Sequence, residues 1–180
     1  KQDGLAFDYT LIGDGDDRDT ILGLIETQGL ADRSRWLGTL PHDVVREHYR
    51  QSDLFVLGCE VAANGDRDGI PNVLVESLAM GVPVVATRVS AIPEIITPGE
   101  TGLLVAPGDP GQMASAMRQG LQDHDLRRKI IAAGRQRVQR ASDVHAGVYD
   151  RMRRDAAEDH RVQLVRFCDR GGRGLHARRS

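Results

Sequence analysis

Residues 60–94, EVAANGDRDGIPNVLVESLAMGVPVVATRVSAIPE, decide the fold that this sequence predicts. A polar run that contains two glycines precedes Pro71. Pro71 suits the first turn of a helix, and Gly81 ends that helix. Residues 82–86, Val-Pro-Val-Val-Ala, then form an apolar run that is typical of a strand buried on both faces of a parallel sheet. The stretch therefore predicts a polar loop, a helix, a buried strand and a second loop that opens another helix.

Asp68 in the loop and Glu76 on the helix mark a candidate ligand site. The backbone N–H groups at a helix N-terminus, together with the helix dipole, favour an anion such as a phosphate. A carboxylate repels a phosphate, but it accepts hydrogen bonds from sugar hydroxyls. The combination indicates a ligand with both a phosphate and hydroxylated rings, namely a nucleotide sugar.

The rest of the chain alternates short apolar strands with amphipathic helices. This alternation predicts an α/β fold, a Rossmann-like parallel sheet flanked by helices, with ligands at the carboxyl ends of the strands. In the helix expected at about residues 110–122, Met113 and Met117 are assigned to core packing. The expected strands lie at residues 7–12, 34–37, 54–57, 82–86 and 103–105.

Length and composition limit the classes of protein that the chain can represent. Its 180 residues predict one domain, and its net charge of −2 gives no general basic character for binding nucleic acid. Two distant cysteines, Cys59 and Cys168, form neither a disulfide framework nor a metal motif, so we expect a reducing compartment. No apolar run is long enough to cross a membrane, and we therefore expect a cytoplasmic protein.

Two other ligand motifs are incomplete in this sequence. The Gly-Asp-Gly of residues 13–15 follows a strand as in dinucleotide-binding proteins, but Arg18 stands where the third glycine is needed. Residues 64–69 imitate the start of a calcium-binding loop, but its twelfth position is Val75 instead of a bidentate carboxylate. We therefore expect neither a metal nor another cofactor.

Residues 68–76, DGIPNVLVE, and residues 77–86, SLAMGVPVVA, resemble the signature of the retaining family-4 glycosyltransferases of the GT-B fold. That signature is Glu-x7-Glu followed by Ala-x-Ala-x-Gly-x-Pro-Val-Val. Its first Glu is replaced here by Asp68, which keeps the charge on a shorter side chain. The resemblance covers about residues 8–157 and includes further blocks at residues 13–15, 36–38, 89–94 and 101–105.

The resemblance implies that the chain binds a nucleotide-diphosphate sugar, whose sugar passes with retention to an acceptor hydroxyl, as in polysaccharide biosynthesis. Glu76 would hold the ribose hydroxyls, and Asp68 would orient a hydroxyl of the donor sugar. GT-B enzymes usually work without a metal. The backbone around the helix start would pack against the sugar and the phosphate, through Gly69, Ile70, Pro71, Asn72 and Val73.

The loop after the second expected strand is implied to lie against the nucleotide base. Its candidate residues are Gly38, Thr39 and Leu40, and Gly13 is the donor-binding candidate in the turn after the first strand. A simple connecting role for the loop at residues 38–40 is an equally open alternative.

The resemblance also implies what the chain lacks. In the family, an Arg and a Lys that grip the diphosphate lie upstream of the Gly13 turn, and Lys1 is too close to Gly13 to be that lysine. We expect residues 1–157 to form a nucleotide-sugar-binding Rossmann-like domain that lacks its first strand and helix. The N-terminal acceptor-binding domain is missing as well, so we expect no sugar transfer by the isolated chain.

Residues 158–180 are expected to form a basic Arg/Gly tail that is disordered, because its few apolar residues cannot build a core. Binding of this tail to RNA, or to an anionic membrane surface as a peripheral contact on the inner face, is an open alternative to a nonfunctional end. For the whole chain, the alternatives are a non-catalytic nucleotide-sugar binding module, a GT-B-type nucleotide-sugar epimerase and a gene fragment.

Overall fold

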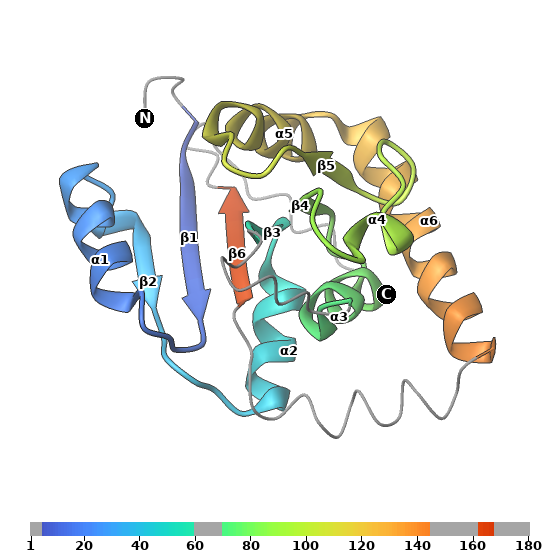
Figure 1. Cartoon of the computed structure of the whole chain (residues 1–180), viewed down its shortest axis with the longest axis horizontal. Helices are drawn as coiled ribbons and strands as arrows, with labels where there is room; N and C mark the ends of the chain where they lie inside the picture. Colours follow the sequence, from blue (N-terminus) through green and yellow to red (C-terminus); the bar gives the residue numbers. More distant parts are fainter. Residues whose placement is uncertain (1–4, 60–69, 145–161, 168–180) are drawn as a thin grey trace.

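The computed structural model describes residues 5–59, 70–144 and 162–167, which form a six-stranded sheet with helices on both faces (Figure 1). The strand order is β2-β1-β6-β3-β4-β5, and the predicted α/β class is confirmed. The strands are β1 (Phe7–Ile12), β2 (Ser34–Trp36), β3 (Leu54–Leu57), β4 (Val84–Thr87), β5 (Leu103–Val105) and β6 (Val162–Phe167). The helices are α1 (Arg18–Thr27), the 3-10 helix η1 (Ala31–Arg33), α2 (His42–Gln51), α3 (Asn72–Met80), α4 (Ile92–Ile95), α5 (Pro110–Gln122) and α6 (His124–Val144).

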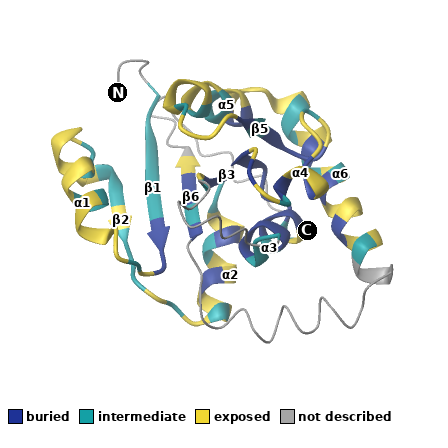
Figure 2. Cartoon of the chain, in the orientation of Figure 1, coloured by how far each residue is buried: buried dark blue, intermediate teal, exposed yellow. Residues whose placement is uncertain are grey.

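β3 and β4 are buried along their whole length, and the two faces of the sheet carry two hydrophobic cores (Figure 2). Successive residues of a strand point to opposite faces, so Phe55 and Leu57 enter one core while Leu54 and Val56 enter the other. The major core lies under α2, α3 and α4. The minor core lies under α5, where Met113 and Met117 pack against it, as the sequence predicts.

The segment at residues 162–167 corrects one prediction, because it forms β6 in the middle of the sheet instead of belonging to a disordered tail. It runs antiparallel to both β1 and β3 in an otherwise parallel sheet. Val162 and Leu164 are buried in the major core, and Val165 is buried in the minor core. These residues are too few to build a core of their own, but they fill the space between β1 and β3. The remainder of residues 158–180 lies outside the described residues.

β6 is the strand that joins the two parallel parts of the sheet. In the described part of the chain, β1 pairs with β2 and β6, while β3 pairs with β4 and β6, and no ladder joins β1 directly to β3. A side-chain hydrogen bond supports this junction, since the Tyr9 hydroxyl donates to Oε1 of Gln163 at 2.7 Å. Burial raises the pKa of Tyr9 far above its usual range, so the hydroxyl stays protonated and keeps donating.

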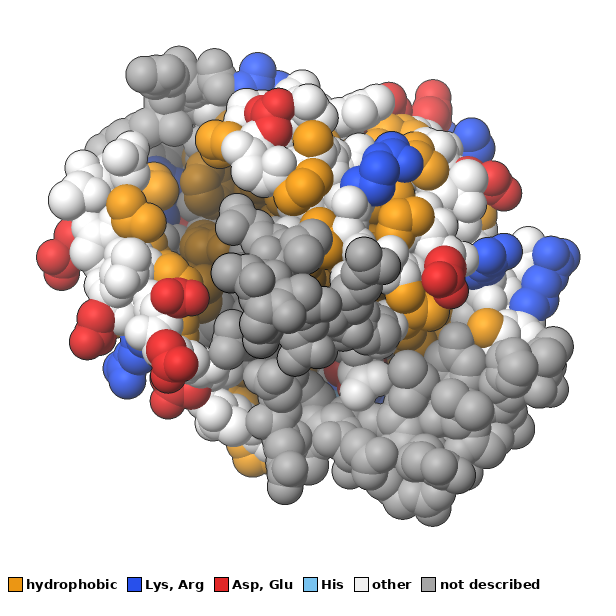
Figure 3. Space-filling view, viewed as in Figure 1, with side chains coloured by type: hydrophobic (Ala, Val, Ile, Leu, Met, Phe, Trp, Pro, Cys, Tyr) orange, Lys and Arg blue, Asp and Glu red, His pale blue; other side chains and the backbone are white. Residues whose placement is uncertain are grey.

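Charge is unevenly distributed on the surface. On the face shown in Figure 3, acidic side chains lie along the edge formed by α1, and basic side chains lie along the edge formed by α6. Among the described residues, no helix combines the length and the apolar character that crossing a membrane requires.

The role of β6 is testable with a pair of substitutions on this strand. Leu164→Ala removes a side chain that is 1% exposed, and we expect it to lower the free energy of unfolding by about 3 kcal/mol through lost burial and a residual cavity. Arg166→Ala, at an exposed position of the same strand, is the matched control and should change it by less than about 0.5 kcal/mol. Urea denaturation followed by circular dichroism measures both, and equal midpoints for the two variants would refute the assignment of β6 to the sheet.

Candidate functional site

The candidate site lies where β3 and β4 end and α3 begins. β3 is followed by Gly58 and Cys59. Residues 60–69 lie outside the described residues, and α3 begins shortly after them. Thr87, the last residue of β4, fixes the exit of β3, because its hydroxyl donates to the Cys59 carbonyl at 2.7 Å. The exits of these two parallel strands are therefore held side by side at the carboxyl edge of the sheet, which is the edge where α/β proteins bind ligands.

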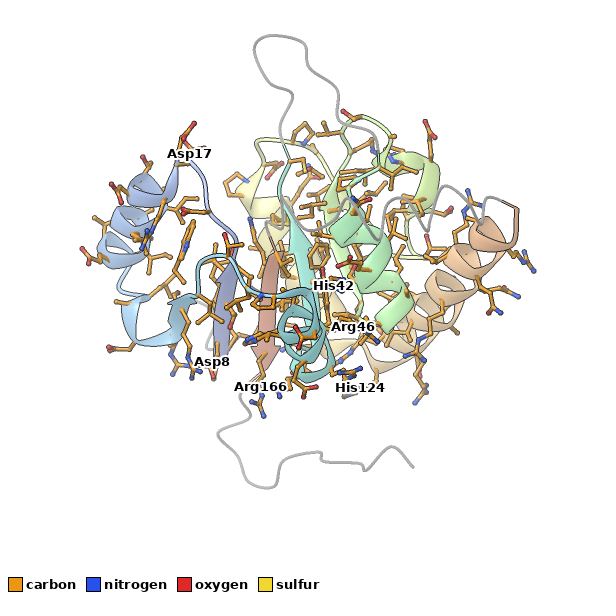
Figure 4. The ribbon with its side chains drawn as sticks, turned by 90° about the horizontal axis from the view of Figure 1, so that it is seen from below. Asp8, Asp17, His42, Arg46, His124 and Arg166 are labelled. Carbon is orange, nitrogen blue, oxygen red and sulfur yellow. The ribbon has the colours of Figure 1, made fainter. Side chains whose placement is uncertain are left out.

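The N-terminus of α3 is better suited to an anion than that of α1. Pro71 precedes the first residue of α3, no described side chain caps this helix end, and its first turn holds no acidic residue. By contrast, α1 begins after Asp17, labelled in Figure 4, and carries Asp19 in its first turn. Like charges repel, so the aspartates disfavour a phosphate at α1, while the helix dipole and backbone N–H groups favour one at α3.

The position of α3 is fixed from both sides. From α2, the buried Tyr49 donates its hydroxyl to the Val73 carbonyl at 3.1 Å. From α6, the Arg135 guanidinium donates to the Met80 carbonyl at 3.0 Å, at the C-terminus of α3. Gly134 lets α6 approach closely, since a Cβ placed there would lie 2.8 Å from Cδ2 of Leu78. α3 is therefore held in place, and with it the position from which each of its side chains extends.

Glu76 is the titratable group of α3, and it faces α2. Its Oε1 lies 3.0 Å from Nε2 of His42, the first residue of α2 (Figure 4 labels His42), and its side chain is 17% exposed. Its Oε2 is buried and has no hydrogen-bond partner among the described residues. Burial, and then the negative charge of Glu76, raise the pKa of Tyr49 well above its usual value. One carboxylate oxygen is thus held by the protein, while the other is able to accept a hydrogen bond.

The structure brings together two of the predicted donor-binding glycines. The N–H of Gly13, after β1, donates to the carbonyl of Gly38, after β2, at 2.8 Å. Both residues have positive φ, 117° and 64°, which favours glycine. In the same loop Thr39 is exposed, and Leu40 packs against the major core.

The other predicted residues cluster at the start of α3, except for two. Ile70, Pro71 and Asn72 are half-buried there. Val73 is buried in the major core, so only its backbone is available to a ligand. Asp68 and Gly69 lie outside the described residues, and their roles stay predictions.

Four further residues near this edge were not among the site residues predicted from the sequence. His42 has no local motif that links it to Glu76, because the two are 34 residues apart. The Trp36 indole N–H is buried without a partner in the described part of the chain, and the Arg18 guanidinium carbon lies 6.0 Å from the Trp36 ring centre. Ser90, after β4, has a φ of 50°, which is uncommon for a residue with a side chain.

The described residues show no metal centre. Within residues 5–59, 70–144 and 162–167, no group of three or more His, Cys, Asp or Glu side chains is placed to hold a metal ion. The expected metal-free site includes the loop at residues 60–69, which lies outside the described residues, so its lack of a metal stays a prediction.

Comparison with known families decides the class of protein. The family model described as glycosyl transferases group 1 matches residues 1–137. The chain belongs to this family. It is 32% identical over 145 residues to the amylovoran biosynthesis glycosyltransferase AmsK of Erwinia amylovora, a match that covers 81% of this chain and 36% of that protein. The chain spans about a third of the length of the curated relatives it matches.

Solved structures agree with the predicted GT-B fold. The C-terminal domain of the glycosyl transferase group 1 protein LpcC from Francisella tularensis has a TM-score of 0.57 and 26% identity, covering 69% of this chain and 61% of that one. The Anabaena protein Alr3699/HepE, in complex with UDP-glucose, has a TM-score of 0.66 and 23% identity, covering 82% of this chain and 40% of that one. The second likeness, at this identity, shows the fold alone.

The positive φ of Gly38 is testable by substitution. A Cβ at Gly38 would meet no atom within 4 Å, so Gly38→Ala introduces only the strain of a positive φ, and we expect a loss of about 1 kcal/mol in the free energy of unfolding. Gly58→Ala, after β3, meets equally open space without a positive φ and serves as the control, with no loss expected. Thermal unfolding compares the two variants, and a loss of the same size at Gly58 would contradict the explanation by φ.

Proposed function

We propose that this chain binds the nucleotide-diphosphate sugar donor of a glycosyl transfer that retains the configuration of the transferred sugar. The observation that carries the proposal is the Glu76 carboxylate, whose Oε2 is buried and without a partner among the described residues. A buried acceptor of this kind is costly unless a ligand satisfies it. The ribose hydroxyls of a nucleotide are suitable donors, and Glu76 is the residue that the family resemblance assigns to them.

The neighbouring elements have suitable chemistry for the rest of the donor. The start of α3 offers backbone N–H groups and the positive end of the helix dipole to the diphosphate. The loops at Gly13 and Gly38 are joined to each other by a hydrogen bond, and we assign the nucleotide base to them. Asp68, at the loop before α3, is proposed to orient a hydroxyl of the donor sugar.

The reaction requires stabilisation of the negative charge that develops on the leaving diphosphate. Preorganised dipoles achieve this because they need no reorganisation as the charge forms. In the proposed mechanism the α3 N-terminus supplies those dipoles, Glu76 and Asp68 hold the donor in place, and no metal takes part.

Transfer to an acceptor is proposed for the whole protein. Because the chain spans about a third of its curated relatives, acceptor binding is assigned to parts that the matched relatives contain outside this region. A cytoplasmic location and a peripheral contact with a membrane stay predictions.

Isothermal titration calorimetry with UDP, GDP and their sugar conjugates tests donor binding. We expect the chain to prefer one base, and Glu76→Ala to weaken binding about 10- to 100-fold, since a hydrogen bond to a charged group contributes roughly 1.5–3 kcal/mol. Glu47→Ala removes the same charge from an exposed position on α2 and should bind as the unsubstituted chain does. Equal affinities for the two variants, or no binding by a folded chain, would overturn the proposal.

A further inference from the structure

We propose that His42 is a positioning residue for the donor site. It holds one oxygen of the Glu76 carboxylate, so that the other oxygen faces the ribose hydroxyls. The inference rests on the proposed function. It adds a role for a side chain on α2, a helix to which the family signature assigns no donor contact.

The contact is set by the packing of α2 against α3. His42, Val45 and Tyr49 are spaced three and four residues apart, and this spacing places them on one face of α2. Val45 and Tyr49 are fully buried, and the Tyr49 hydroxyl binds the α3 backbone at Val73. The face of α2 that carries His42 is therefore fixed against α3. The packing of these two helices holds the imidazole beside Glu76.

The contact between His42 and Glu76 makes the two carboxylate oxygens different. An ionised carboxylate only accepts hydrogen bonds, so Nε2 of His42 must carry the proton in its 3.0 Å contact with Oε1. Oε2 is buried and has no partner in the described part of the chain. Without His42 the carboxylate would rotate, and its two oxygens would exchange places or turn toward solvent. Holding it in one orientation reduces the conformational freedom that is lost when the ligand binds.

His42 is itself accessible, which makes the inference testable. Its side chain is 41% exposed, so a substitution there leaves the buried side chains of Val45 and Tyr49 in place. A positioning role acts on the hydroxyl contact alone, because the diphosphate is assigned to the backbone at the start of α3. The expected signature is therefore a loss of discrimination between nucleotides with and without ribose hydroxyls, instead of a uniform loss of affinity.

The experiment compares UDP with 2′,3′-dideoxy-UDP by titration calorimetry on the full chain, or the guanine pair if GDP is the preferred nucleotide. His42→Phe keeps a ring of similar size without an N–H donor, and His42→Gln restores a donor at similar reach. We expect His42→Phe to weaken binding of the ribonucleotide about three- to tenfold and to leave the dideoxynucleotide within about twofold. His42→Gln should regain most of the difference. His48→Phe, the same substitution elsewhere on α2, should match the unsubstituted chain.

The outcomes separate this inference from the proposed function. If the unsubstituted chain binds neither nucleotide or does not distinguish the two, or if Glu76→Ala retains the discrimination, the ribose contact of Glu76 is refuted and the role of His42 with it. If Glu76→Ala abolishes the discrimination but His42→Phe retains it, only the role of His42 is refuted. An equal loss for both nucleotides in His42→Phe, with no recovery in His42→Gln, also refutes positioning and indicates a structural role.

Discussion

The ladders that β6 forms with β1 and β3 are the interactions on which the rest of the structure depends. Within the described residues they are the only strand ladders that connect the β1–β2 pair with the β3–β4–β5 group. The same strand inserts Val162 and Leu164 into the major core, beside the residues of α2 and α3 that carry the candidate site. The orientation of the site therefore relies on a segment far from it in the sequence.

The site itself combines backbone and side-chain contributions that arise from different physical causes. The α3 N-terminus attracts an anion through its dipole, and its position is set by Tyr49 from one side and Arg135 from the other. Glu76 contributes a hydrogen-bond acceptor, one oxygen of which is in contact with His42. In the proposed site, the long-range attraction of an anion and the short-range selection of hydroxyls are thus separable properties of α3.

Much of the fold was predictable from local pattern, because the signals lie within a few residues of one another. The helix between Pro71 and Gly81 and the apolar strand after it follow directly from turn chemistry and hydrophobic runs. β6 was missed because its burial depends on a space between two distant strands, which no local pattern encodes. The contact between His42 and Glu76 was missed for the same reason, since it is created by helix packing.

The central place of β6 also has a consequence for the order of folding. The other strands precede β6 in the chain and pair among themselves, so they are able to form two partial sheets before it joins them. Its insertion closes very long loops, as in the Tyr9–Gln163 pair, whose residues are 154 positions apart, and such closure is entropically slow. Until then β1 and β3 each expose an unpaired edge that another chain is able to bind. Refolding of this protein should therefore become less efficient as its concentration rises.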